Sequence, residues 1–398
     1  MSEVRANNLT NANQTGGPTL SGITTFSSTH FLVPPSGDTA SRPSGSPVGA
    51  LRFNTDTYHL EYYRGDTIGW TEIEASHVEI GGAATSGSTD GKGTRGLIAG
   101  GIVPGSPASL AINNVDAITL DTLGNSIDFG NLSTTRTNTS QIGSATRSLV
   151  AGGVGPTNSQ YDTVVNTIEF CNFATQSDYV DFGDLTRTGY SGSAFGNKVR
   201  ACFAGRTVAD DNVISYVTMS STGDAKDFGD MTQTKGYHGS FSSSTRGFML
   251  GGLDVPTAYN TIEFVTTATT GNGVDFGDIM FPNYEMAAAS NSVRGLRAGG
   301  YGPNYTSRIE FINMATQGDT MRFGDLTDNF AGTGKSAVSS PTRCVIAGGF
   351  VNPNSPFQNI IQFVNIATTG NALDFGDLQG FGRNSQNGSS NGHGGLAG

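Results

Sequence analysis

The chain is poor in charged residues and in the side chains that build catalytic and metal centres. Charged residues make up 14% of its 398 residues, against roughly 25% in average globular proteins. Its five histidines show neither an HExxH motif nor paired ligand spacing. Cys171, Cys202 and Cys344 have no CxxC spacing, which argues against a disulfide framework or zinc site and predicts buried free thiols. We therefore expect neither a metal nor another cofactor.

The charge that is present is mainly negative, with a formal net charge of -11 at pH 7. Nucleic-acid binding needs clustered Lys and Arg against the phosphates, so this balance argues against it. It also argues against binding to anionic membrane surfaces. No run approaches the roughly 18 apolar residues of a membrane-spanning helix. Residues 1–17 lack a basic segment followed by an apolar one, so no secretory signal is expected.

Glycine is abundant, at 57 residues, and one unit recurs six times between Arg95 and Asp377. Its first half has the form TRGLIAGG (94–101), and its second half ends in DFGN, DFGD or RFGD. The six arginines are Arg95, Arg147, Arg200, Arg246, Arg294 and Arg343, with spacings by subtraction of 52, 53, 46, 48 and 49. The matching phenylalanines are Phe129, Phe182, Phe228, Phe276, Phe323 and Phe375. A period of about 50 residues with several short apolar runs is typical of a β-propeller blade.

We expect four strands, A to D, in each repeat. Strand A is a run of small residues such as 190–197, and strand B is an apolar run such as 200–205. Strand C alternates like NTIEF at 166–170, and strand D ends in DFGD, which is interpreted as a turn rather than a kinase-type magnesium loop. The recurrent arginines are expected to bond carbonyl groups or the Asp turn of a neighbouring blade, rather than to form an anion-binding ring.

This order of strands resembles the kelch repeat over roughly residues 80–398. It departs from the family because Phe stands in all six repeats where kelch strand D carries Trp. The resemblance implies kelch-like packing. A copper radical oxidase on such blades would need a Tyr/His/Cys constellation, and a sialidase would need Asp boxes ending in Trp. The sequence singles out no such constellation, and its one Trp is Trp70, so no enzymatic activity is expected.

Residues 1–48 are rich in Ser, Thr, Asn, Gly and Pro, which predicts an extended arm. The run 31–70 resembles a segment of tail fibres and other virion proteins of tailed bacteriophages. The matching residues are Pro35, Gly37, Thr39, Arg42, Pro43, Gly49, Arg52, Phe53, Asn54, Thr55, Thr57, Leu60, Tyr62 and Trp70. The resemblance implies a virion structural protein, and propellers with such arms look most like those of marine cyanobacterial phages.

The repeat continues beyond the last DFGD. Placing Leu378 on Leu185 puts His393 on Arg200, which predicts a further A and B strand in 379–398. HLEYY (59–63) and GWTEIE (69–74) look like strands C and D, with Trp70 in the kelch position. We therefore expect seven blades, because an unpaired last strand would expose a sheet edge. The alternative is six blades with 49–75 as a separate hairpin module.

These observations give the expected domains. They are an anchoring arm at 1–48 and a propeller at 49–398, in which 49–79 and 379–398 form the closing blade around six repeats at 80–378.

The function expected from these features is a non-enzymatic structural protein of a phage tail, neck or capsid appendage. It would be made in the host cytoplasm, join other virion proteins through residues 1–48, and form a homo-oligomer, with a trimer favoured. The alternative is a receptor-binding fibre tip that adheres to host surface glycan. Candidate ligand contacts are Tyr161, Tyr301, Tyr305 and Phe357 in the B–C loops, which vary most between repeats. Nucleic acid and membrane are not expected partners.

Overall fold

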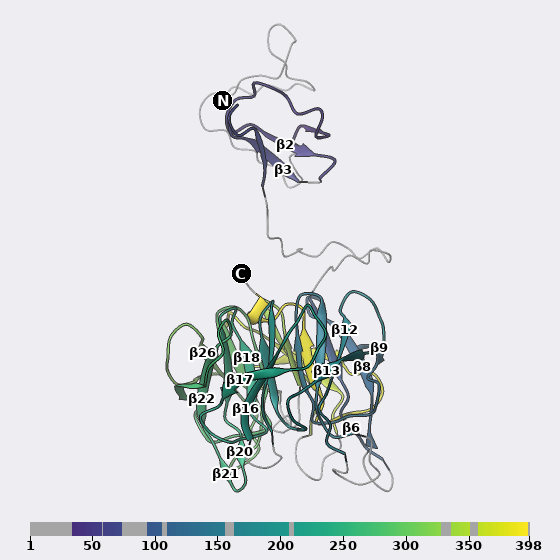
Figure 1. The fold of residues 1–398 in the computed structure, drawn as a ribbon, viewed down its shortest axis with the longest axis vertical. Helices are drawn as coiled ribbons and strands as arrows, with labels where there is room; N and C mark the ends of the chain where they lie inside the picture. The colour runs from purple at the N-terminus through teal and green to yellow at the C-terminus, as the bar shows by residue number, and fades with distance from the viewer. Residues whose placement is uncertain are drawn as a thin grey trace, which may run out of the picture. The chain divides into compact units, whose positions relative to one another are not determined.

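A computed structural model of the chain describes residues 34–57, 59–73, 94–105, 110–155, 163–206, 211–327, 336–350 and 357–396. The chain divides into two compact units, a small one at Met1–Val78 and a large one at Glu79–Gly398 (Figure 1). In the described residues the regular elements are β-strands, with one turn of 3-10 helix at Gly394–Leu396. The expected all-β class is confirmed, and its four-stranded antiparallel sheets are consistent with a propeller-like fold.

The small unit is a four-stranded sheet in the order β1-β2-β3-β4, with β1 parallel to β2 and the other pairs antiparallel. Its strands are β1 Ser36–Gly37, β2 Leu51–Asn54, β3 Leu60–Tyr63 and β4 Trp70–Glu72. The buried side chains of β2 and β3 are largely polar, since Arg52, Asn54 and Glu61 are all enclosed. Trp70 lies beside Tyr63, with ring centroids 5.3 Å apart, and its Nε1 donates to the Pro43 carbonyl at 3.1 Å. Residues 34–48 are therefore part of this sheet unit.

The large unit contains six four-stranded sheets, each with strands A to D in spatial order. Two short hairpins extend B–C connections: β6 Ile102–Val103 with β7 Leu110–Ala111, and β20 Leu253–Asp254 with β21 Thr257–Ala258. Sheet 1 is β32 Asn387–Ser390, β5 Arg95–Ala99, β8 Asn114–Thr119 and β9 Ile127–Asn131. Sheet 2 is β10 Ser140–Gly143, β11 Arg147–Ala151, β12 Thr167–Asn172 and β13 Val180–Asp184. Sheet 3 is β14 Ser193–Gly196, β15 Arg200–Arg206, β16 Asp211–Thr218 and β17 Lys226–Asp230.

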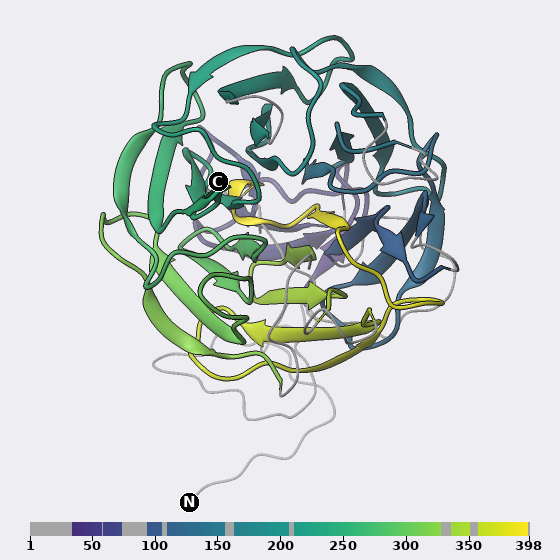
Figure 2. The same cartoon turned by 90° about the horizontal axis from the view of Figure 1, so that it is seen from below.

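The other three sheets repeat this arrangement. Sheet 4 is β18 Gly239–Ser242, β19 Arg246–Leu250, β22 Thr261–Thr266 and β23 Val274–Asp278. Sheet 5 is β24 Ala287–Ser290, β25 Arg294–Ala298, β26 Arg308–Asn313 and β27 Met321–Asp325. Sheet 6 is β28 Ser336–Ser339, β29 Arg343–Ala347, β30 Ile360–Asn365 and β31 Leu373–Asp377. Figure 2 shows the sheets around a common centre, with the A strands innermost.

Hydrophobic clusters lie between neighbouring sheets, because strand B is apolar on both faces. Sheets 6 and 1 share one of these clusters, in which Val345 of β29 and Ile98 of β5 are both fully buried. Cys171, Cys202 and Cys344 lie in three of the clusters as buried free thiols, as the sequence predicts. The hydrophobic core is therefore divided into separate layers, each of which lies between two neighbouring sheets.

The predicted pairing of the C-terminal segment with residues 50–75 is wrong. β32 pairs with β5 in the register Asn387↔Ala99, while β2 to β4 pair among themselves in the small unit. The described residues 49–57 and 59–73 are thus not part of a closing blade, and this pairing agrees with the alternative of a separate N-terminal module. The expected final B strand is also absent, since 394–396 is a helical turn. The physical reason is that β5 already occupies the B position beside β32.

The recurrent arginines link each sheet to the next. In five of the six, the guanidinium lies 4.7–5.0 Å from the centroid of a strand C aromatic ring in its own sheet. The same guanidinium donates to a carbonyl of the following sheet, as Arg147 does to Met219 at 3.0 Å. The last link, from Arg343 of sheet 6 to the Leu120 carbonyl of sheet 1 at 2.9 Å, returns to the start. The arginines therefore have the expected structural role.

The DFGD sequences form strand D itself rather than a turn. In β13, Phe182 is buried and Gly183 adopts a φ of 146°. A Cβ on Gly183 would collide with the Gly223 backbone of sheet 3, so the close approach of two sheets requires glycine. The Asp184 amide then donates to Asp224 Oδ1 of the neighbouring sheet at 3.0 Å. The carboxylate that accepts is on the next repeat, and not on the DFGD sequence as expected.

We predict that Arg246→Ala lowers the free energy of unfolding by about 2 kcal/mol, since it removes a stacked cation and a charged hydrogen-bond donor. The Arg246 guanidinium lies 4.7 Å from the Phe264 centroid and donates to the Met314 carbonyl at 3.2 Å. Arg246→Lys should recover less than half of the loss, because an ammonium cannot stack and donate in the same geometry. Denaturant unfolding measures both variants, and equal stability of Lys and Arg at this position would contradict the stacking role.

Candidate functional site

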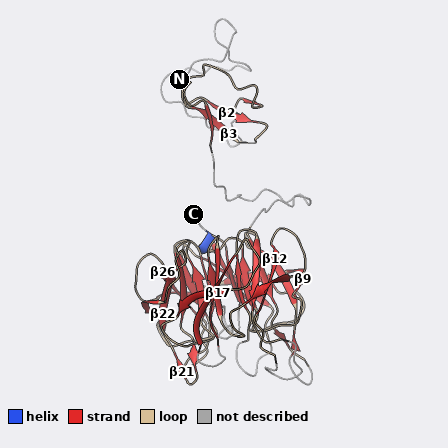
Figure 3. Ribbon diagram, viewed as in Figure 1, coloured by secondary structure: helices blue, strands red, loops and turns tan. Residues whose placement is uncertain are grey.

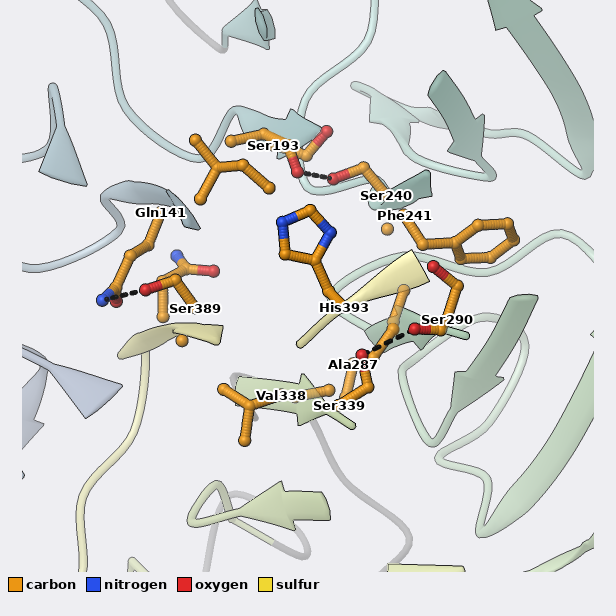
Figure 4. A pocket seen from close by; sticks show the side chains of 18 of the residues that line it. Gln141, Ser193, Ser240, Phe241, Ala287, Ser290, Val338, Ser339, Ser389 and His393 are labelled. Atoms are coloured by element: carbon orange, nitrogen blue, oxygen red, sulfur yellow. Dashed lines mark hydrogen bonds between the residues drawn. The ribbon is translucent and has the colours of Figure 1, made fainter. Parts of the chain in front are cut away.

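The six A strands surround a central cavity of about 90 Å³. Most of its lining residues are small or polar, as Figure 4 shows for Ser193, Ser240, Ala287, Ser339 and Ser389, and Phe241 and Val338 add apolar surface. No Asp, Glu, Lys or Arg is among the lining residues. A cavity needs roughly 10–15 Å³ to hold one water molecule, so this space suits several waters rather than a large ligand.

Serine side chains tie the A strands to one another around this cavity. The residues at the ends of successive A strands donate to the carbonyl of the preceding sheet: Ser242 to Gly196, Ser290 to Ser242 and Ser339 to Ser290, each at 2.7 Å, and Ser390 to Ser339 at 2.5 Å. The series stops where Gly143 and Gly196 lack a hydroxyl. His393 Nε2 instead lies 2.7 Å from the Gly143 carbonyl.

The C-terminal segment closes one end of the cavity. The helical turn Gly394–Leu396, blue in Figure 3, follows directly after β32 and His393. A Cβ on Gly394 would collide with the Asn291 carbonyl, and one on Gly395 with the Gly196 carbonyl. Two glycines are therefore required to fit the turn between the A strands. The segment predicted as a strand B closes the cavity instead.

Two buried histidines face the cavity and remain neutral. Burial lowers the pKa of His393 to about 4. Burial and the nearby Lys235 ammonium lower the pKa of His238 to about 3. His238 Nδ1 lies 2.8 Å from Ser193 Oγ, and its Nε2 lies 3.1 Å from the Ala204 carbonyl. In a nucleophilic triad a carboxylate would stabilise the imidazolium, whereas here a carbonyl holds a neutral ring, which suits a structural histidine.

The other end of the cavity opens into a mouth of about 70 Å³. Its rim is made of D–A connections in which a non-glycine residue, two positions before strand A, has a left-handed φ of 53–56°. We call these the mouth residues; they are Asn138, Ser191, Tyr237, Glu285 and Ser385. Backbone hydrogen bonds join these residues around the mouth in the order Ser385, Asn138, Ser191, Tyr237 and Glu285. The amide of each residue after the first donates to the carbonyl of the one before it.

A row of aromatic rings runs from this mouth across the B–C loops of sheets 5 and 6. Successive centroids lie 6.4, 5.4, 4.6, 6.1 and 6.2 Å apart. We call this set the aromatic row; in order it is Tyr237, Tyr284, Tyr301, Tyr305, Phe350 and Phe357. All six side chains are half-buried, so each is held in place and still presents part of its ring.

The structure brings three of the four predicted ligand contacts together. Tyr301, Tyr305 and Phe357 belong to the aromatic row, and Tyr161 lies outside the described residues. The sequence interpretation missed Tyr237, Tyr284 and Phe350. Tyr284 and Tyr301 are joined by a β-bridge between a D–A connection and a B–C loop, a contact that no local pattern signals.

The sequence interpretation also missed a set of buried ion pairs inside the sheets. In three sheets a basic residue four positions before strand A pairs with a strand C acid: Lys235 with Glu263 at 2.7 Å, Arg383 with Asp116 at 2.6 Å, and Arg136 with Glu169. In sheet 5, Arg297 of β25 pairs with Glu310 instead. In sheets 3 and 6 the strand C position holds Ser215 and Gln362, and the basic position holds glycine in the sequence. Each sheet thus has both the acid and its basic partner, or it has neither.

Within the described ranges, no group of three or more His, Cys, Asp or Glu side chains is placed to hold a metal ion. The described elements also include no helix with the length and apolar character of a membrane span. In comparisons with known proteins, no protein-family model matches the chain and no curated protein shows significant similarity to it.

Proposed function

We propose that the protein is a non-enzymatic structural component of a tailed-phage particle, in a tail, neck or capsid appendage. The small unit would attach to other virion proteins, and the large unit would be displayed. The support is the fibre-like run 31–70, whose Arg42, Asn54 and Glu61 form a bonded cluster in the small unit. This run builds a compact unit separate from the repeats, as an attachment module requires.

We also propose that the large unit is a closed six-bladed propeller with kelch-like packing. Two observations support this proposal: β32 pairs with β5, and the Arg343 guanidinium of sheet 6 donates a hydrogen bond to the Leu120 carbonyl of sheet 1. The first and last repeats therefore share a sheet. Such closure leaves only short strand edges that neighbouring sheets protect.

A homo-oligomer, with a trimer favoured, is proposed for the particle. It is supported by the apolar outer side of the small unit, where Leu51, Leu60 and Ile73 are exposed by 54%, 42% and 40%. Grouped apolar side chains on so small a sheet suit contact between copies. Sedimentation of the full chain tests this, and a monomer at micromolar concentration would contradict it.

Host attachment through surface glycan is a second candidate function, favoured by the aromatic row. Thr94, the first described residue of the large unit, and Asn391, which follows β32, both lie at the end where strands A and B connect. Tyr301 and Phe357 lie in the connections between strands B and C of sheets 5 and 6, which are at the opposite end. A displayed propeller could therefore attach by one end and bind through the other.

The attachment proposal predicts that deleting residues 1–78 yields a folded large unit that no longer joins particles. The cut belongs at 78, because a cut at 48 would separate β1 from β2 within the small unit. Incorporation is measured by complementing a particle that lacks the protein and quantifying the chain in purified particles. A second deletion, of residues 1–33 alone, keeps strands β1 to β4 and shows whether they suffice for incorporation. Normal incorporation of the chain that lacks 1–78 would overturn the proposal.

A further inference from the structure

We propose that the cavity mouth and the aromatic row form one binding site for an uncharged oligosaccharide. A terminal sugar would lie against the mouth with its hydroxyl groups directed into it, and the following sugars would lie over the rings. This inference rests on the second candidate function above and deepens it by naming the class of ligand and its orientation.

The aromatic row supplies the stacking surface. Tyr237 belongs both to the mouth and to the row, so the mouth and the ring surface are continuous. Each ring contacts the next, as between Tyr301 and Tyr305 at 4.6 Å, which fixes the side chains before a ligand arrives. Tyrosines bind with a large apolar face and a polar tip, and they lose little conformational entropy when they do so. A flat ring that carries hydroxyl groups, as a pyranose does, matches both properties.

The mouth supplies polar contacts and a fixed shape. The left-handed φ of the mouth residues is an unusual conformation for Tyr237 and Glu285, both non-glycine residues, and such strain gathers at binding sites. Asn138, Ser385 and Asn387 contribute amide and hydroxyl groups to the mouth wall. Groups of this kind donate to and accept from sugar hydroxyls without adding charge.

The charges around the site select an uncharged ligand. Glu285 is the only charged side chain among the mouth lining residues. Burial, and then the Glu285 carboxylate, raise the pKa of Tyr284, and burial is also the first cause of the raised pKa of Tyr305. The chain as a whole carries a net charge of -11. A sulfated or uronic-acid glycan would meet like charge here with no Lys or Arg in the mouth or the row to pair with it.

The test measures binding of the full chain to immobilised hexasaccharides of glucose, mannose, galactose and N-acetylglucosamine, alongside sulfated and uronic-acid hexasaccharides. We expect at least one uncharged hexasaccharide to bind. Its affinity should rise from monosaccharide to hexasaccharide as successive rings are covered. Binding of none of the uncharged probes, preference for an anionic probe, or affinity independent of length would each overturn the proposal.

Variants locate the site. Tyr301→Ala combined with Tyr305→Ala should weaken hexasaccharide binding roughly tenfold or more, while Tyr301→Phe should change it less than about threefold because the ring remains. Tyr62→Ala, at a half-buried tyrosine of the small unit, is the matched control and should bind as the native chain does. Native affinity in the double alanine variant would overturn the assignment. Particle incorporation of that variant is measured separately, so a failure of attachment is distinguished from a failure of sugar binding.

Discussion

Removing residues 381–398 should leave the large unit unable to fold, because the segment supplies the first strand of sheet 1 and several contacts to neighbouring sheets. β32 is the innermost strand of sheet 1 and pairs with β5 over four residues. The Ser390 hydroxyl joins this strand to the Ser339 carbonyl of sheet 6 at 2.5 Å. Arg383 forms a buried ion pair with Asp116 at 2.6 Å. Loss of the segment therefore acts on both sides of the seam between the first and last repeats.

The expected effect exceeds the stability of an ordinary domain. An uncompensated buried Asp116 costs about 3–5 kcal/mol by itself, and the total free energy of unfolding is only about 5–15 kcal/mol. Loss of the β32 ladder and of the Ser390 contact adds to this. Far-UV circular dichroism and limited proteolysis of the truncated chain should show neither native sheet content nor a protected fragment.

Two deletions serve as controls for this experiment. Deleting residues 1–78 removes far more chain but leaves every contact of β32, so the thermal midpoint of the large unit should stay within about 2 °C of native. Deleting 394–398 keeps Arg383, β32 and His393 but removes the helical turn, so we expect a folded ring with an intermediate loss of stability. A native thermal midpoint for the chain that lacks 381–398 would refute the closing role.

The strands inside each repeat could be predicted because their signals are local. The apolar run after Arg147 and the alternation of NTIEF at 166–170 each report the environment of one strand. These signals recur six times, so an irregular copy such as 211–218 is located by its neighbours. The recurrent arginines likewise had a simple physical interpretation, as charged donors to backbone carbonyl groups.

The pairing of β32 with β5 could not be predicted, because it joins segments that are distant in the sequence. Residues 59–63 and 69–74 contain strands, as expected, but short aromatic strands fit many sheet edges. The match of 381–398 to strands A and B was correct for strand A. It was wrong for strand B, since β5 fills that position and the Gly-rich end turns into the cavity.

The candidate site was only partly visible in the sequence for a similar reason. Tyr301 and Tyr305 lie close together in one loop, and loop aromatics are a recognisable signal. No residue type is common to all the mouth residues, since Asn138, Tyr237 and Glu285 occupy equivalent places. What they share is a backbone conformation fixed by hydrogen bonds between sheets, which no single repeat reveals.

The second large expected effect concerns the buried ion pairs, whose acid and base are present together or replaced together. In sheet 4, Lys235 and Glu263 are both almost fully enclosed, and Lys235 Nζ lies 2.7 Å from Glu263 Oε1. The second oxygen of Glu263 accepts from the Thr232 amide at 2.7 Å. Burial lowers the pKa of Lys235, so its ammonium form depends on the facing carboxylate. Sheet 6 lacks this charge, because Gln362 takes the carboxylate position and accepts from the Thr327 amide at 2.8 Å.

Lys235→Met should therefore lower the free energy of unfolding by about 3–5 kcal/mol, because it leaves the Glu263 carboxylate buried without its cation. Glu263→Gln should cost a similar amount for the opposite reason. The double variant reproduces the neutral arrangement of Gln362, keeps an acceptor for Thr232, and should lose only about 1–2 kcal/mol, which gives a coupling energy of at least about 4 kcal/mol. Thermal and denaturant unfolding of the four proteins measure this cycle.

The control is Arg322→Met, which removes an exposed ion pair with Asp325 and should change stability by less than about 1 kcal/mol. If the losses of the two single variants added up in the double variant, the two side chains would be independent polar groups, and the joint replacement of acid and base in sheets 3 and 6 would need another cause.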